Sequence, residues 1–241
     1  MGYLSGEPMR TFFRSATLSV VFLFAAFGLA PRLVSQPGWQ SLFNGRDLSG
    51  WVPVNGEPGT WRVEKGEIVS TGLPIGVMRS ERQYENFLLE VDWMHTASGG
   101  NSGIFLWSDA IPGERNRLPN GIEVQMLDHE WVTENRRPGF DPPIAYVQGE
   151  LFGVGGVRTI PDNPRGERSK ALRQLTRPRW HWNHYTVVAV DGTVKLAVNG
   201  TFVNGLSHST KRRGYLCLEA EGAEIHFKNL RILELPPSAP L

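Results

Sequence analysis

The stretch that decides the fold runs from Tyr185 to Val203 and reads YTVVAVDGTVKLAVNGTFV. β-branched and other apolar residues dominate residues 185–190, 193–198 and 201–203. The dipeptides Asp191-Gly192 and Asn199-Gly200 separate these runs, and both are favoured in the two-residue turns of β-hairpins. The stretch therefore predicts three consecutive antiparallel strands.

The rest of the chain repeats this rhythm of short strands and turns. We expect further strands at residues 61–64, 67–70, 87–93, 103–107, 121–127, 214–220 and 224–235. In the last of these, Ile225 and Phe227 alternate in one phase and Leu230 and Ile232 in the other, so a bulge near Lys228-Asn229 is expected. Residues 167–175 are a weak helix candidate. The pattern favours an all-β sandwich of two antiparallel sheets.

The first residues have the composition of a secretory signal. Arg10 and Arg14 precede an apolar run at residues 16–30, which is shorter than the ~20 residues that span a bilayer. We expect residues 1–35 to be a signal peptide, cleaved after Ala30 or Ser35. The alternative is an uncleaved N-terminal anchor. Residues 36–241 would then form one secreted or periplasmic domain, in contact with a membrane only if the signal is retained.

Charge and cysteine content exclude several classes of protein. The formal net charge is +1, from 25 basic and 24 acidic residues that are mixed along the chain, so nucleic acid is not an expected partner. Cys217 is the only cysteine, which excludes an intramolecular disulfide and a cysteine metal cluster. Its apolar neighbours predict a buried position in a strand.

Residues 121–128, GIEVQMLD, carry the most informative polar side chains. Alternation places Ile122, Val124 and Met126 on one face of a strand and Glu123 and Gln125 on the other. Glu123 and Gln125 could simply face water, or they could line a groove on a concave sheet. Asp128 lies an odd number of residues from Glu123, so it joins that face only at a strand end or bulge.

Other residues could contact a ligand. Asn101 lies in the glycine-rich turn at 99–103, where glycine permits close approach of a ligand, although its amide could equally hold the turn together. Glu219 alternates with Leu218 and Ala220 and could share the face of Glu123. A transition-metal site would need His95, His129 or His181 to converge with a carboxylate, and no local ligand spacing indicates one. The candidate substrate-binding residues are His95, Trp107, Asp128, Tyr146, Trp180, His181 and Glu219.

Five blocks of the chain together resemble the bacterial 3-keto-disaccharide hydrolase family, long known as a domain of unknown function. The blocks, in order, are residues 42–51, 99–106, 121–128, 182–185 and 227–232. The resemblance implies a concanavalin A-like jelly roll with a carbohydrate substrate, which we expect to bind in a groove between the two sheets. Many members carry Gln and His where this chain has Glu219 and Glu221, and this departure puts the substrate in doubt more than the fold.

The chemistry that the resemblance implies needs one base. Ordinary glycosidases use two carboxylates, about 5–5.5 Å apart when retaining and about 6.5–9.5 Å apart when inverting. Here Gln125 stands two residues after Glu123, where related β-glucanases have a second acid. A 3-keto sugar has an acidic hydrogen on C2, so one base can remove it and the C1 substituent can leave. Water then adds to the enone, as in a hydrolase, or the unsaturated sugar departs as the product of a lyase. We expect Glu123 to be that base, with Gln125 and Asn101 as donors to the substrate.

Two other functions stay open at this point. The same sandwich serves non-catalytic carbohydrate-binding modules and lectins. A conventional glycosidase could draw its second carboxylate from Glu219, Glu90 or Asp128. No cofactor is evident, and calcium held by loop carbonyls and carboxylates would leave no readable spacing.

Overall fold

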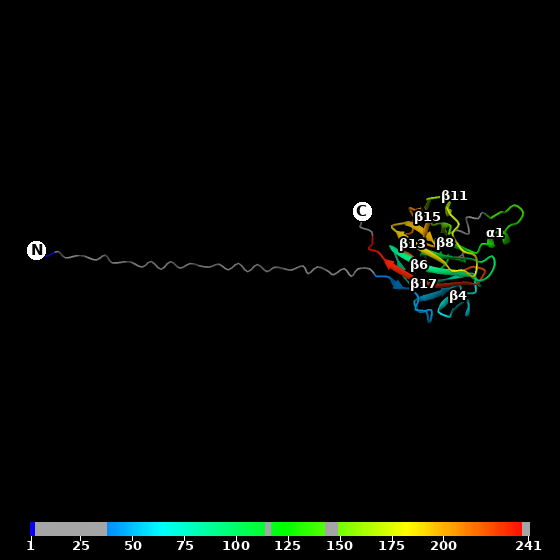
Figure 1. The fold of residues 1–241 in the computed structure, drawn as a ribbon, viewed down its shortest axis with the longest axis horizontal. Coiled ribbons are helices and arrows are strands. Elements are labelled where there is room, and N and C mark those ends of the chain that lie inside the picture. The colour runs from blue at the N-terminus through cyan, green and yellow to red at the C-terminus, as the bar shows by residue number, and fades with distance from the viewer. Residues whose placement is uncertain (3–37, 114–116, 143–148, 238–241) are drawn as a thin grey trace. The chain divides into compact units, whose positions relative to one another are not determined.

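The computed structural model describes residues 1–2, 38–113, 117–142 and 149–237, and residues 38–237 contain two antiparallel sheets (Figure 1). The first sheet has the order β10 (Ile160–Pro161), β15 (Thr201–Ser207), β14 (Thr193–Val198), β13 (Asn183–Val190), β6 (Phe87–His95), β17 (Ile225–Glu234), β4 (Glu67–Ser70) and β3 (Trp61–Glu64), with β1 (Gln40–Ser41) beside β17. The second has the order β11 (Pro164–Arg165), β12 (Arg168–Ser169), β9 (Leu151–Val154), β8 (Gly121–Leu127), β7 (Asn101–Ser108), β16 (Gly214–Ala220), β5 (Gly76–Tyr84) and β2 (Trp51–Val54).

One hydrophobic core fills the space between the sheets. Strand β6 buries every second residue, including Val91 and Trp93, and β8 contributes Ile122, Val124 and Met126 to the same core. This confirms the predicted sandwich and the predicted faces of β8. The sugar was expected to bind in a groove between the two sheets. That prediction is wrong, because close-packed side chains of the core occupy this space.

The predicted meander is confirmed as β13, β14 and β15. Asp191 and Gly192 have φ of 47° and 76°, and Asn199 and Gly200 have φ of 48° and 86°. Two successive residues with positive φ are what a type I′ turn requires, and its twist matches that of the flanking strands. The bulge in β17 is also confirmed, since its register with β6 shifts between Lys228 and Arg231.

Residues 167–175 do not form the helix that we considered. Arg168–Ser169 is strand β12, and further along the N–H of Leu172 donates to the carbonyl of Val203. Pairing with neighbouring segments therefore replaces the i→i−4 bonds of a helix. A short helix, α1 (Trp131–Glu134), lies instead in the long segment after β8.

Two expectations concern the rest of the chain. Cys217 is buried in β16, as predicted. The signal peptide expected at residues 1–35 stays a prediction, since positions 3–35 lie outside the described residues. Among the described residues, no helix has the length and apolar character to cross a membrane.

Candidate active site

A cavity of about 1010 Å³ lies against the face of the second sheet that points away from the core. Strands β7 and β8 form its floor through Asn101, Glu123 and Gln125. Its walls come from α1, from β9 and the loop after it, and from β11 and β12. Glu221, directly after β16, completes the polar end.

The polar floor follows from the alternation in β8. Since Ile122, Val124 and Met126 point into the core, Glu123 and Gln125 must point into the cavity. Gln125 Nε2 donates to Asn101 Oδ1 at 2.8 Å and to the carbonyl of Ser102 at 3.2 Å. Both N–H groups of Gln125 are thus used within the protein, which disagrees with its predicted role as a donor to the substrate and leaves its carbonyl for that purpose. Asn101 Nδ2 donates to Glu221. Its second N–H has no acceptor among the described residues, so it is available for a substrate oxygen.

Glu219 joins Glu123 on this face, as its alternation predicted. Gly103 of β7 lies between the two glutamates: a Cβ built there would stand 3.0 Å from Cγ of Glu123 and 3.1 Å from Oε2 of Glu219. Glycine therefore makes room for both carboxyl groups. The side chain of Glu219 is completely buried, and neither of its oxygens receives a hydrogen bond from an N–H or O–H donor in the described part of the chain.

We expect Gly103→Ala to separate activity from stability. The added methyl group would press on Cγ and Oε1 of Glu123 and on Oε2 of Glu219, and not on backbone. The free energy of unfolding should therefore fall by about 1–3 kcal/mol. The displaced carboxyl groups should lower kcat/KM about 100-fold, because small misplacements of reacting groups have effects of that order. Thermal melts and steady-state kinetics on the same preparation measure both quantities. Unchanged kinetics would show that the spacing of these carboxyls is unimportant.

Glu123, Glu219 and Glu221 cannot all be ionised together. Burial, and next the negative charge of Glu221, raise the pKa of Glu123 to about 8, although Arg168 opposes the shift. Burial, followed by the charges of Glu123 and Glu221, raises the pKa of Glu219 well above its usual range. Burial also raises the pKa of Glu221, while its hydrogen bond with Glu219 acts in the opposite direction. Burial and mutual repulsion therefore favour the protonated forms of Glu123 and Glu219.

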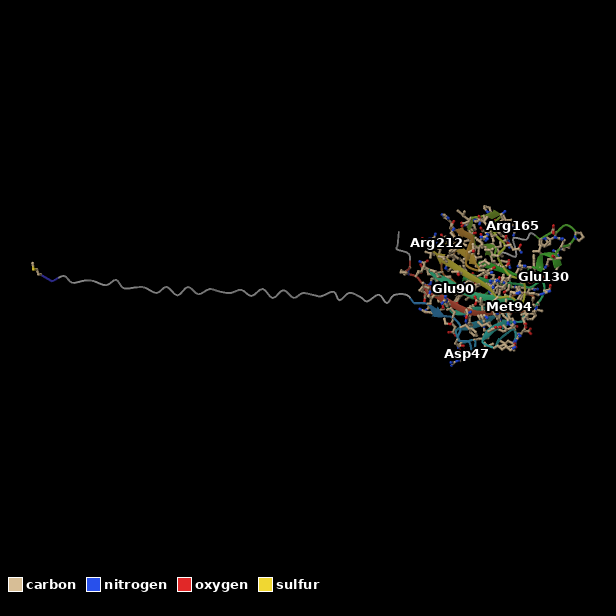
Figure 2. All side chains as sticks on the ribbon, viewed as in Figure 1. Asp47, Glu90, Met94, Glu130, Arg165 and Arg212 are labelled. Carbon is tan, nitrogen blue, oxygen red and sulfur yellow. The ribbon has the colours of Figure 1, made fainter. Side chains whose placement is uncertain are left out.

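A cationic wall faces this cluster. Glu150 is completely buried and accepts hydrogen bonds from Arg165, labelled in Figure 2, and from Arg168 Nη1 at 3.1 Å. The guanidinium of Arg168 also lies 3.6 Å from the centre of the Phe152 ring, which lines the cavity. Contact with Glu150 and Phe152 thus holds Arg168 at the cavity surface.

Three predicted contact residues lie away from the cavity surface. His95 is buried, its Nε2 donates to the carbonyl of Met126 at 2.9 Å, and burial lowers its pKa to about 4. Trp107 lies in the core with Nε1 donating to the carbonyl of Glu85 at 2.7 Å. Asp128 Oδ2 accepts from the N–H groups of Gly99 and Glu130, so it organises the turns at the end of β8. The structure disagrees with direct substrate contact by these three side chains.

Trp180 and His181 also lie outside the cavity lining. Trp180 is 65% exposed with φ of 64°, and the His181 ring contacts the carbonyl of Arg179. Tyr146 lies outside the described residues. The three histidines considered for a metal each contact a different group: His95 the carbonyl of Met126, His129 the hydroxyl of Thr176 and His181 the carbonyl of Arg179. Within residues 38–113, 117–142 and 149–237, no group of three His, Cys, Asp or Glu residues is arranged to hold a metal ion.

Several cavity residues were not predicted. The chief of them is Glu221, which was noted only as a departure from the resembling family; the others include Trp131, Phe152, Arg165 and Arg168. The combination of aromatic and basic residues in the long segment at 129–179 was the available signal for this wall.

Comparison with known proteins agrees with the fold and names the family. A solved candidate glycosyl hydrolase from Parabacteroides distasonis ATCC 8503 is 24% identical with a TM-score of 0.63, over 83% of this chain and 94% of that one. The carbohydrate-binding module CBM66 from Bacillus subtilis is 15% identical with a TM-score of 0.54, over 77% of this chain and 96% of its own. These likenesses concern the fold and confirm the lectin-like jelly roll. No curated protein matches the chain. The model of one family, described as the 3-keto-alpha-glucoside-1,2-lyase-like domain, matches residues 38–233, and this chain belongs to that family.

Proposed function

We propose that this protein cleaves 3-keto-glycosides by removing the proton on C2 and expelling the substituent on C1. Membership of the 3-keto-alpha-glucoside-1,2-lyase-like family supports the substrate class. The observation that carries the reaction is that Glu123 and Glu221 line one cavity, with the buried Glu219 next to Glu123. Burial raises the pKa of Glu123 and Glu219, while Asn101 donates a hydrogen bond to Glu221. A single site thereby offers a base and an acid at the same pH.

The reaction needs both of these groups. The C3 ketone acidifies the hydrogen on C2, a carboxylate takes that proton, and the C–H electron pair forms an enolate across C2 and C3. The ketone then re-forms as the C1–O bond breaks, and the leaving oxygen takes a proton from a carboxylic acid. The second N–H of Asn101 could donate to the enolate oxygen, an interaction of the kind that contributes about 3–4 kcal/mol in oxyanion holes.

A conventional glycosidase is the second candidate, and one observation favours it. Glu221 supplies the cavity with a second carboxyl group beside Glu123, which a hydrolytic mechanism on an unoxidised sugar would need. The family match weighs in favour of the oxidised substrate.

Turnover of paired native and 3-oxo glycosides tests the proposal. We expect the purified protein to release the leaving group from the 3-oxo compound and not from its native partner, with or without a chelator. Glu123→Gln should lower kcat for a 3-oxo disaccharide about 10²–10⁴-fold, as loss of an acid or base does. Equal turnover of the native glycoside would establish the conventional glycosidase. Binding of both sugars without cleavage would leave a carbohydrate-binding module.

A further inference from the structure

We propose that Glu221 is the base that takes the C2 proton, that Glu123 is the acid that protonates the leaving oxygen, and that Glu219 is a positioning residue that keeps Glu221 ionised. This assignment rests on the proposed function and reverses the role expected for Glu123 from the sequence.

The carboxylate of Glu221 has two hydrogen-bonding partners, Asn101 and Glu219. Asn101 Nδ2 donates to its carboxylate, and Gln125 holds the Asn101 side chain in place at 2.8 Å. The buried carboxyl of Glu219 also meets Glu221. Neither oxygen of Glu219 accepts a hydrogen bond from an N–H or O–H donor among the described residues. We therefore assign the proton of this pair to Glu219, which donates it to Glu221. Hydrogen bonds to the charged form favour that form, so Glu221 is the ionised member.

Glu123 is in the opposite situation. It is 5% exposed and receives no hydrogen bond within the described part of the chain. The charged groups that act on it are Glu221, Arg168 and Glu150, and its own charge acts on Glu219. Arg168, the one cation among these, also pairs with Glu150 at 3.1 Å. Glu123 therefore keeps its proton, in agreement with the rise of its pKa to about 8.

The two groups reach the cavity from different strands. Glu123 belongs to β8, Glu221 follows β16, and β7 runs between these strands in the sheet. Between Glu123 and Glu221, strand β7 contributes only the short amide side chain of Asn101 and Gly103, which has no side chain. A sugar lying over β7 could thus meet the base at C2 and the acid at the oxygen on the neighbouring C1.

The step balances without another reactant. Glu221 gains the C2 proton, the C–H electron pair becomes the enolate and then the C1=C2 bond, and the electrons of the C1–O bond leave with the glycosidic oxygen. That oxygen takes the proton of Glu123. Glu221 ends protonated and Glu123 ionised, and exchange of one proton with water at each group restores the starting state.

Two leaving groups separate the roles. A sugar or alkyl leaving group needs a proton, whereas a nitrophenolate departs without one. We expect Glu221→Gln to lower kcat/KM about 10²–10⁴-fold for both types of 3-oxo-glucoside. Glu123→Gln should do so for the alkyl compound and leave the nitrophenyl compound within about 10-fold of wild type. The reverse pattern, or equal losses for both variants on both substrates, would overturn the assignment. If the wild-type protein cleaves neither compound, the proposed function itself fails.

The pH profile gives an independent readout. With Glu123 as the acid, wild-type kcat/KM for the alkyl compound should fall as pH rises through about 8, and this fall should be absent with the nitrophenyl compound. A rise through the same range would identify Glu123 as the base. Glu219→Gln retains a donor to Glu221 and should keep the acidic limb in place, whereas Glu219→Leu should move it to higher pH. Thermal melts verify that both variants fold. If the acidic limbs of their pH profiles coincide, Glu219 does not position Glu221.

Discussion

Replacing Glu123 by glutamine is expected to stabilise the folded protein by about 3–4 kcal/mol more at pH 8 than at pH 5. The pKa of Glu123 is raised from 4.5 to about 8 in the folded protein, mainly by burial. Between these values the folded state holds a proton that the unfolded state has lost. The free energy of unfolding therefore falls as pH rises through this window, and the loss is complete only above about 8. Glutamine does not ionise, so the variant should escape the loss.

Urea unfolding of wild type and variant at the two pH values measures the difference. The matched control is Glu81→Gln in β5, whose side chain is exposed and whose replacement should change stability equally at both pH values. Glu221→Gln should give an intermediate slope, because the negative charge of Glu221 is the second cause of the raised pKa of Glu123. A pH-independent effect of Glu123→Gln would mean that this carboxyl titrates normally in the folded state.

Alternation within a strand was sufficient to predict the fold and part of the floor of the site. Residues 185–203 specify a meander through their turns, and β8 separates its core side chains from Glu123 and Gln125 by parity alone. Both inferences are local, since successive side chains in a strand point to opposite faces whatever the strand pairs with.

Trp107 shows where side-chain alternation fails to predict the face on which a residue lies. Trp107 lies two residues after Phe105, so regular alternation would place both on the outer face of β7. Phe105 does pack there, but Trp107 lies in the core with Leu106. The register between β7 and β16 shifts between Tyr215 and Cys217, and Trp107 has φ of 51°. A bulge therefore reverses the face of this residue. No residue type in the sequence marks that position.

The convergence of Glu221 and Arg168 on Glu123 was beyond sequence reasoning for a different reason. Arg168 belongs to β12, and β9 separates that strand from β8 in the sheet, while Glu221 arrives from β16 on the other side of β7. Their proximity depends on the order of strands in the sheet, which alternation within one strand does not contain. The carboxyl cluster is visible only once that order is known.

Substituting Asn204 by leucine is expected to lower the free energy of unfolding by about 3–5 kcal/mol, because it leaves buried polar groups without partners. Asn204, on β15 of the first sheet, donates from Nδ2 to the carbonyls of Gly149 and Ser169 at 2.9 and 2.6 Å. Its Oδ1 accepts from Ser169 Oγ and from the N–H of Gly205, both at 2.8 Å.

These bonds tie the first sheet to the segment that forms the wall of the cavity. Gly149 precedes Glu150, and Ser169 follows Arg168 in β12, so losing their partner should loosen the pair that holds the cation near Glu123. We therefore expect kcat/KM for 3-oxo-glycosides to fall as well, in the fraction that remains folded at low temperature. The control is Asn163→Ala, which removes only a 3.4 Å bond to Asn204 and should cost less than about 1 kcal/mol. Similar urea midpoints for the two variants would show that the hydrogen bonds of Asn204 contribute little to stability. Unaltered kinetics in Asn204→Leu would show that the cavity wall keeps its position without these bonds.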